Sequence, residues 1–225
     1  ALAVIGILLI VIPRYEKDNR NRGVLIQGLF RGQFVFFGIP LMANIFGDEG
    51  LVVLSTLIAI IVPIYNFLAV IILDLFTDER HNYKATIISI LTNPLVIGSL
   101  LGIAASVLQI KLPSALNKTI ADISKTVTPI SLMILGGVIE INNIWKNRKK
   151  LILIAAVKLF IIPSFAALIT IFFGYRGIEL GAVLSMIAPP TAVASYTLAQ
   201  QHDCNDELAG QIVFFTTLIS PFSIF

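Results

Sequence analysis

The sequence predicts an all-α protein that crosses a membrane several times. Its composition is the first reason: 57% of the 225 residues are hydrophobic and 13% are charged, whereas soluble domains have about 45–50% and about 25%. Apolar runs of about 20 residues, long enough to cross a bilayer as helices, recur along the chain and are the second reason. Prolines inside two of these runs are the third, because they indicate helices that break at membrane depth.

Short polar segments divide the chain into about eight expected spans. A turn at 47–50 separates the second span from the third, and a short helix beginning at Pro113 precedes the fifth, which is too short to cross alone. The small residues Gly98, Gly102 and Ala105 predict close packing of the fourth span against a neighbour. The expected spans are 1–12, 24–46, 51–76, 85–110, 126–139, 151–173, 180–201 and 208–225.

Charge and cysteine content exclude several classes. The net charge of +3 comes from lysines and arginines in loops, a pattern that orients membrane proteins and does not indicate nucleic-acid binding. The single cysteine, Cys204, allows no internal disulfide, and no residue spacing resembles a metal site, so we expect no cofactor. The sequence begins without methionine and stops at Phe225 within an apolar run. We interpret it as a piece of a longer protein, truncated at both ends.

The clearest break lies between Leu184 and Gln201, where Pro189 and Pro190 interrupt an apolar stretch. Proline has no N–H to donate and its ring crowds the carbonyl four residues earlier, so the helix should break there. In hydrocarbon, the freed backbone groups need protein or a wet cavity as partners. We therefore expect a binding site at this break.

The proline spacing predicts a second break and an internal repeat. Pro13 and Pro40 are 27 residues apart, and so are Pro163 and Pro190, which places the two pairs 150 residues apart. The first break is accordingly expected beside Gly38 and Pro40. Broken helices at corresponding places in two halves are typical of secondary transporters.

Lysine and arginine are unequally distributed between alternate loops. The loops at 13–23, 77–84, 140–150 and 201–207 carry ten of these residues, and the opposite set carries four. The positive-inside rule places the first set in the cytoplasm. An odd number of crossings then separates the two breaks, so the two broken helices enter from opposite sides, as in an inverted repeat.

Short motifs recur in a definite order over nearly the whole chain. They are Phe37-Gly38-Ile39-Pro40-Leu41 with Phe46-Gly47, Asn93-Pro94 with Gly98 and Gly102, the run from Thr128 to Gly136, Lys158 with Pro163, and Pro190-Thr191-Ala192-Val193 with Leu198-Ala199. Together they resemble the auxin efflux carrier family of membrane transporters. The chain departs from the family at Gln33, because seven residues before the crossing proline the family often has Asn.

The resemblance implies ten helices in two inverted five-helix repeats, so that two opening helices are absent from this sequence. It implies a transport part at 1–76 and 151–225, scaffold helices at 85–139, and crossing helices at 24–46 and 180–201. It also implies export of organic anions, such as auxin in plants and dicarboxylates in bacteria, and a homodimer through the scaffold.

A helix that restarts after a break should present unpaired N–H groups and a positive dipole end, which favour an anion. Because proline suits the first helical position, the candidate amides are those of Leu41, Met42, Thr191 and Ala192. Donor side chains from the same region are Gln33, Asn44, Thr191, Ser195 and Tyr196. The expected substrate-binding residues are Gln33, Gly38, Pro40, Leu41, Asn44, Lys158, Pro189, Pro190, Thr191 and Ser195.

Several of these residues have a plainer interpretation. Thr191 and Ser195 could bond their own backbone, and Asn44 could serve a helix end. Proline often only kinks a membrane helix, which is the preferred interpretation for Pro63, Pro129, Pro163 and Pro221.

Two cations fall inside expected spans. Lys158 lies about eight residues into its span, where a charge costs about 3 kcal/mol unless it is paired or wet. We interpret it as an anion attractor or a proton-coupled switch, with snorkelling to the cytoplasmic face as the alternative. Arg31 lies at similar depth, and there we expect snorkelling.

These observations predict a secondary transporter of small organic anions that works by alternating access, and not an enzyme. An intramembrane protease would need HExxH or paired aspartates, neither of which occurs, and His81 and His202 lie in loops. Asp48, Glu49 and Glu179 lie at helix ends, which argues against a sodium–proton antiporter. A sodium-coupled anion symporter and a non-transporting receptor remain alternatives. We expect a multi-pass protein of the bacterial inner membrane whose partners are the anion and the bilayer.

Overall fold

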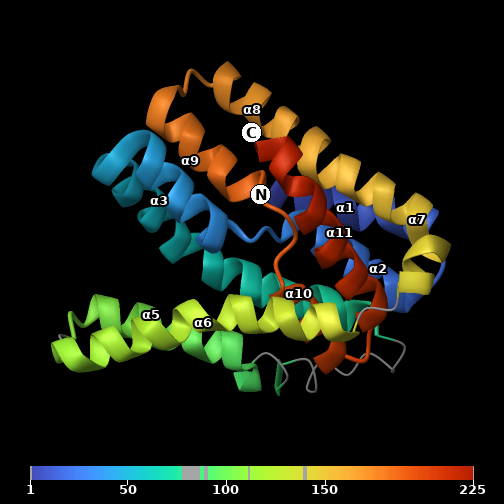
Figure 1. Cartoon of the computed structure of the whole chain (residues 1–225), viewed down its shortest axis with the longest axis horizontal. Helices are drawn as coiled ribbons and strands as arrows, with labels where there is room; N and C mark the ends of the chain where they lie inside the picture. The colour runs from blue at the N-terminus through green and yellow to red at the C-terminus, as the bar shows by residue number, and fades with distance from the viewer. Residues whose placement is uncertain (1, 78–86, 89–90, 111, 139–140, 225) are drawn as a thin grey trace.

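A computed structural model describes residues 2–77, 87–88, 91–110, 112–138 and 141–224. This part of the chain is helical throughout, apart from turns and one isolated β-bridge (Figure 1). The predicted all-α class is therefore confirmed. The expected loop charges Arg80, Lys84, Lys111 and Glu140, and the loop histidine His81, lie outside the described residues.

The helices follow the expected spans in outline. Among the described residues, three are long and apolar enough to cross a membrane: Phe34–Leu75, Ile144–Phe172 and Asp206–Ile224. The full set is α1 Leu2–Tyr15, α2 Asn19–Phe30, α3 Phe34–Leu75, α5 Pro94–Val107, α6 Ser114–Val138, α7 Ile141–Ala156, the π-helical turn η1 Val157–Ile161, α8 Ile162–Phe172, α9 Gly177–Ile187, α10 Ala194–Gln201 and α11 Asp206–Ile224.

Helix α3 is a hairpin of two helical arms. Gly47 interrupts it with φ 60° and ψ −147°, a conformation that residues with a Cβ rarely adopt, and Figure 1 shows the chain turning back there. The turn is tight, because a Cβ on Gly50 would lie 2.6 Å from that of Phe46. The predicted turn at 47–50 is thus confirmed.

Two breaks interrupt the helical course of the chain. The second lies between Ile187 and Ala194, around Pro189 and Pro190, as predicted. The first lies at residues 31–33 and not at Pro40, which is inside α3. That prediction was wrong because α3 continues through Pro40, as membrane helices can where neighbouring groups satisfy the freed backbone. The backbone at 31–33 instead has partners outside its own helix.

Helix boundaries recur along the chain at a spacing that differs from the proline spacing. The ends of α1 and α8, Tyr15 and Phe172, are 157 residues apart, and the starts of α2 and α9 are 158 apart. The ends of α2 and α9 are again 157 apart. Pro13 lies near the end of α1 whereas Pro163 lies at the start of α8, so the offset of 150 was wrong.

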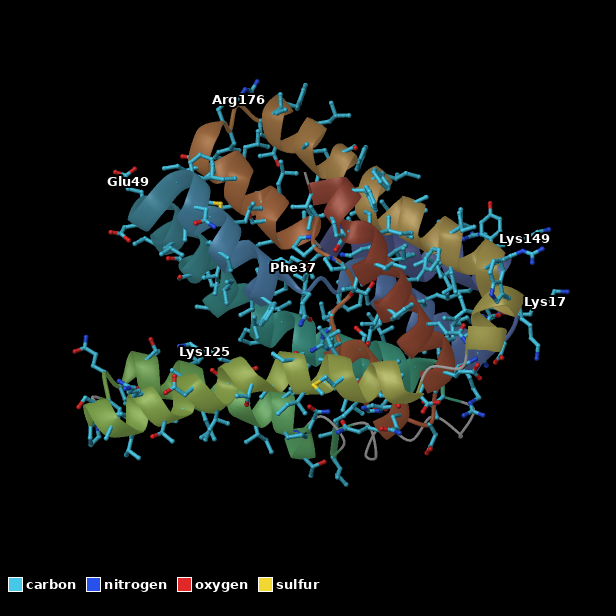
Figure 2. All side chains as sticks on the ribbon, viewed as in Figure 1. Lys17, Phe37, Glu49, Lys125, Lys149 and Arg176 are labelled. Atoms are coloured by element: carbon cyan, nitrogen blue, oxygen red, sulfur yellow. The ribbon has the colours of Figure 1, made fainter. Side chains whose placement is uncertain are left out.

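Loops predicted to share one membrane face meet one another. Arg20 Nε donates to the Asp203 carbonyl at 2.9 Å, Lys150 Nζ lies 2.5 Å from a Glu16 carboxylate oxygen, and His202 Nδ1 lies 2.6 Å from Asp74 Oδ1. Figure 2 shows Glu49 and Arg176 at the opposite end of the molecule from Lys17 and Lys149. The grouping of the loops therefore agrees with the charge count. Assignment of this face to the cytoplasm stays a prediction.

Residues 114–138 form one helix, α6, where a short helix and a separate span were expected. Pro129 lies within it without ending it, and Pro63 and Pro221 are likewise inside helices. Asn93 caps α5, with its Oδ1 accepting from the amide of Leu95 at 3.0 Å. Nothing among the described residues lies within 4 Å of a Cβ placed on Gly98 or Gly102, so the close packing expected there is not seen.

Candidate substrate site at the helix crossing

The two breaks cross each other in antiparallel directions. Gly32 and Thr191 form the β-bridge at the centre. Gln33 N donates to the Pro190 carbonyl at 2.8 Å, and Ala192 N donates to the Arg31 carbonyl at 3.0 Å. Opposite chain directions are what an inverted repeat requires, and each break supplies the backbone partners that the other lacks.

Gly32 lets the two backbones approach. A Cβ at this position would lie 3.1 Å from the Met186 carbonyl oxygen, 3.4 Å from that of Pro189 and 3.4 Å from Lys158 Nζ. Two of these three neighbours are backbone atoms, which cannot easily move aside. The crossing therefore depends on the missing side chain.

Side chains from both repeats fix the crossing further. Gln33 Oε1 accepts from the amide of Val193 at 3.1 Å, and the Thr191 hydroxyl donates to the Gly28 carbonyl at 2.7 Å in the last turn of α2. The amide of Thr191 in turn donates to Thr216 Oγ1 on α11 at 3.2 Å. The polar side chains of Gln33 and Thr191 thus hold protein groups, and their binding of substrate stays a prediction.

The four amides expected to face an anion do not do so. Those of Thr191 and Ala192 are used by Thr216 and by the Arg31 carbonyl, and Leu41 and Met42 lie within α3 rather than at its start. The helix start that remains is the first turn of α3, at Phe34 and Val35, because the first amides of a helix have no acceptor within it. Both residues line a cavity.

Lys158 lies buried at the crossing, beside Gly32. Only 1% of the residue is exposed, and its Nζ donates to the Ile187 carbonyl, the last of α9, at 3.3 Å. A cation at a helix C-terminus meets the negative end of the helix dipole. The residue sits in the π-helical turn η1, and such turns are frequent at functional sites.

Arg31 is buried as well, with 6% of the residue exposed, so the expectation that it snorkels was wrong. It follows the last residue of α2, and one terminal nitrogen donates to Asn66 Oδ1 at 2.6 Å. Its other terminal nitrogen, Nη1, is buried and has no hydrogen-bond partner in the described part of the chain. Arg31 and Lys158 thus stand beside the C-terminal ends of α2 and α9, the two half-helices before the breaks.

A cavity of about 590 Å³ opens beside the first break. The crossing and both arms of α3 form most of its wall, and α6 contributes Ser124 and Lys125. Its lining residues are Arg31, Gly32, Gln33, Phe34, Val35, Phe36, Ile39, Pro40, Val62, Tyr65, Asn66, Ser124, Lys125 and Ala192.

A family model described as "Membrane transport protein" matches residues 78–225, well over half of the chain. The chain belongs to the auxin efflux carrier family. No curated protein matches it. The family is one of transporters and not of enzymes. Residues 1–77 lie outside the match, and their helices α1, α2 and the first arm of α3 follow the same order as α8, α9 and α10.

Within this auxin efflux carrier homologue, two of the ten expected binding residues, Gln33 and Pro40, line the cavity. Gly38 instead packs against α9, where an added Cβ would lie 2.8 Å from the Ser185 carbonyl oxygen. Asn44 is exposed near the Gly47 turn, and Ser195 is buried with a hydroxyl that has no partner among the described residues. The other expected residues, Leu41, Lys158, Pro189, Pro190 and Thr191, do not line the cavity.

Sequence reasoning missed Asn66 and Thr216 and misjudged Arg31. All three are polar residues within apolar runs, a signal that was used for Lys158 and could have been used for them. The glycine between Arg31 and Gln33 was a further signal, since a membrane helix that must cross another at close range needs a small residue.

Replacing Thr191 by valine is expected to lower the free energy of unfolding by about 1–3 kcal/mol, because the buried Gly28 carbonyl would lose its donor. Thermal unfolding of the full-length transporter in detergent would measure this. Thr191→Ser should keep most of the stability, and Thr197→Val, at an exposed position of α10, is the matched control. Equal stability of Thr191→Val and wild type would contradict the assigned hydrogen bond.

Proposed function

We propose that this chain is the larger part of a secondary transporter that moves small organic anions by alternating access around the helix crossing. One observation carries the proposal: two buried cations, Arg31 and Lys158, stand at the crossing, and neither forms a salt bridge within the described residues. Buried charges are normally paired, because burial without a counter-charge is costly. A bound anion would supply the missing charge.

The position of the cavity supports the alternating-access mechanism. The crossing and α3 belong to the expected transport part, at 1–76 and 151–225, and α6 belongs to the expected scaffold at 85–139. Residues of both the transport part and the scaffold line the cavity. A movement of the transport part against the scaffold would therefore change the side of the membrane from which a ligand can enter the cavity. Transporters with inverted repeats move in this way around a site near the bilayer midplane.

A sodium-coupled symporter is less well supported. Sodium at a broken helix is bound by the carbonyl oxygens of unwound backbone and helix ends. Here the Ile187 carbonyl, at the end of α9, already accepts from Lys158, so a protein cation occupies that position. A receptor would bind the anion at the same site but would not move it across the membrane, so only a flux measurement distinguishes the two functions.

We further propose a multi-pass location in a bacterial inner membrane, with the face formed by the loops around Glu16, Lys150 and Asp203 in the cytoplasm. The excess of lysine and arginine in these loops supports this orientation. A homodimer through the scaffold would use α5 and α6, whose apolar residues are largely exposed.

Flux measurements on the full-length protein in proteoliposomes test the transport function. Labelled malate, malonate and indole-3-acetate would be followed with and without a pH gradient, in wild type and in Pro190→Ala and Lys158→Ala. Uptake of at least one of these anions is expected, with loss of uptake in both variants. Pro113→Ala, at an exposed position just before α6, is the control and should transport as wild type. Binding without flux of any anion would support the receptor instead.

A further inference from the structure

Arg31 has the geometry of a ligand-binding side chain. Its backbone is held on both sides, because its amide donates to the Gln27 carbonyl at 2.9 Å and its own carbonyl accepts from Ala192. Arg31 lines the cavity, and in its guanidinium one nitrogen donates to Asn66 while Nη1 is buried without a partner in the described part of the chain. A buried donor without an acceptor is costly, and an acceptor on a ligand in the adjoining cavity would remove that cost.

The partner that Arg31 does have is neutral. Asn66 offers its side-chain oxygen to the guanidinium, and its Nδ2 donates to Ser99 Oγ on α5 at 2.9 Å. This chain of hydrogen bonds fixes the orientation of the guanidinium without neutralising its charge. Asn66 is therefore a positioning residue, and the charge stays available to a ligand.

The rest of the cavity indicates what the ligand carries besides its charge. Phe34, Phe36, Ile39, Val62 and Tyr65 give the wall an apolar character. The second cation on the wall, Lys125, lies 3.5 Å from Asp122 of its own helix, and both side chains are mostly exposed. The cavity thus has one dedicated buried cation beside an apolar surface.

We propose that Arg31 binds the carboxylate of the transported anion, and that the site prefers a monocarboxylate with an apolar body over a dicarboxylate. The guanidinium presents parallel N–H groups that match a carboxylate. The first turn of α3, at Phe34 and Val35, directs the positive end of its dipole to the same cavity. A second carboxylate would have to lie against the apolar wall, where it would find no buried partner. The assignment rests on the proposed function.

Equilibrium binding to the full-length protein in detergent tests the assignment, with phenylacetate, its neutral analogue phenylacetamide, and malonate as probes. We expect saturable binding of phenylacetate, with at least tenfold weaker binding of the other two. Arg31→Met should weaken phenylacetate binding by about 30-fold, the effect of losing a charge-assisted bond. Arg176→Met, in a distant exposed turn, should bind as wild type. Wild-type affinity in Arg31→Met, or a preference for malonate, would overturn the proposal.

A second variant covers the case in which Arg31→Met does not fold. Asn66→Asp keeps the size of the side chain and gives Arg31 a permanent counter-charge, so the fold should survive. Phenylacetate binding should then fall by at least about tenfold, because the carboxylate site is already occupied. Asn117→Asp, at an exposed position of α6, is the control. Undiminished binding in a folded Asn66→Asp would also overturn the proposal.

Flux separates this assignment from the proposed function. If phenylacetate crosses the membrane equally well with wild type and Arg31→Met, the result supports the transport function and contradicts the role of Arg31. If phenylacetate binding depends on Arg31 but no anion crosses the membrane, the result supports the role of Arg31 and contradicts the transport function.

Discussion

Gly32→Leu is expected to abolish transport and to destabilise the protein. Any Cβ at this position meets the carbonyl oxygens of Met186 and Pro189 at 3.1 and 3.4 Å, and a leucine would force the two breaks apart. The bonds from Gln33 to Pro190 and from Ala192 to Arg31 would then be lost. We expect the free energy of unfolding to fall by roughly 2–3 kcal/mol from overpacking alone. Thermal unfolding and proteoliposome flux would be measured on the same preparations.

Gly6→Leu, at an exposed position of α1, is the matched control, because no neighbouring part of the described chain lies within 4 Å of a Cβ placed there. It should unfold at the wild-type temperature and transport at the wild-type rate. Retention of wild-type flux by Gly32→Leu would mean that transport does not require backbone contact between the two breaks. The crossing would then have no role in the transport mechanism.

Lys158→Met is expected to separate function from stability. An anion about 8 Å from the ammonium gains about 2 kcal/mol at an effective dielectric constant of about 20, so its affinity should fall roughly 30-fold. Stability should stay equal or rise, because removal of an unpaired buried charge offsets the lost hydrogen bond to Ile187. Substrate affinity and unfolding temperature would be compared in detergent.

Lys118→Met, on the exposed surface of α6, controls for loss of a lysine and should change neither quantity. A different pattern in Lys158→Met, with unchanged affinity and a large fall in the unfolding temperature, would indicate that Lys158 only caps α9. The anion-attracting role would then be withdrawn.

The architecture could be predicted from the sequence because its signals are local. A bilayer requires long apolar runs, and Pro189 and Pro190 break a helix wherever they occur. The first break could not be placed in the same way, because a single glycine between Arg31 and Gln33 weakens a helix without ending it. Their departure from helical geometry depends on partners at Pro190 and Ala192, which only the folded chain brings near.

The binding residues were harder to predict for a related reason. A proline pattern identifies a break, but whether an amide at the break is free depends on distant side chains. Thr216 takes the amide of Thr191, and Asn66 turns a cation expected at the surface toward the interior. These are tertiary contacts across 25 and 35 residues, and no local pattern reports them.

The mutual pairing of the two breaks has a consequence for biosynthesis. Gln33 is synthesised 157 residues before Pro190, the residue that accepts its amide hydrogen. The first half of the chain therefore enters the bilayer with a discontinuity whose backbone groups have no protein partner until the second half is inserted. Pairing of the first break must therefore be among the last steps of folding. A nascent chain that stalls before residue 188 would expose unpaired backbone groups in the membrane, where quality-control proteases can act.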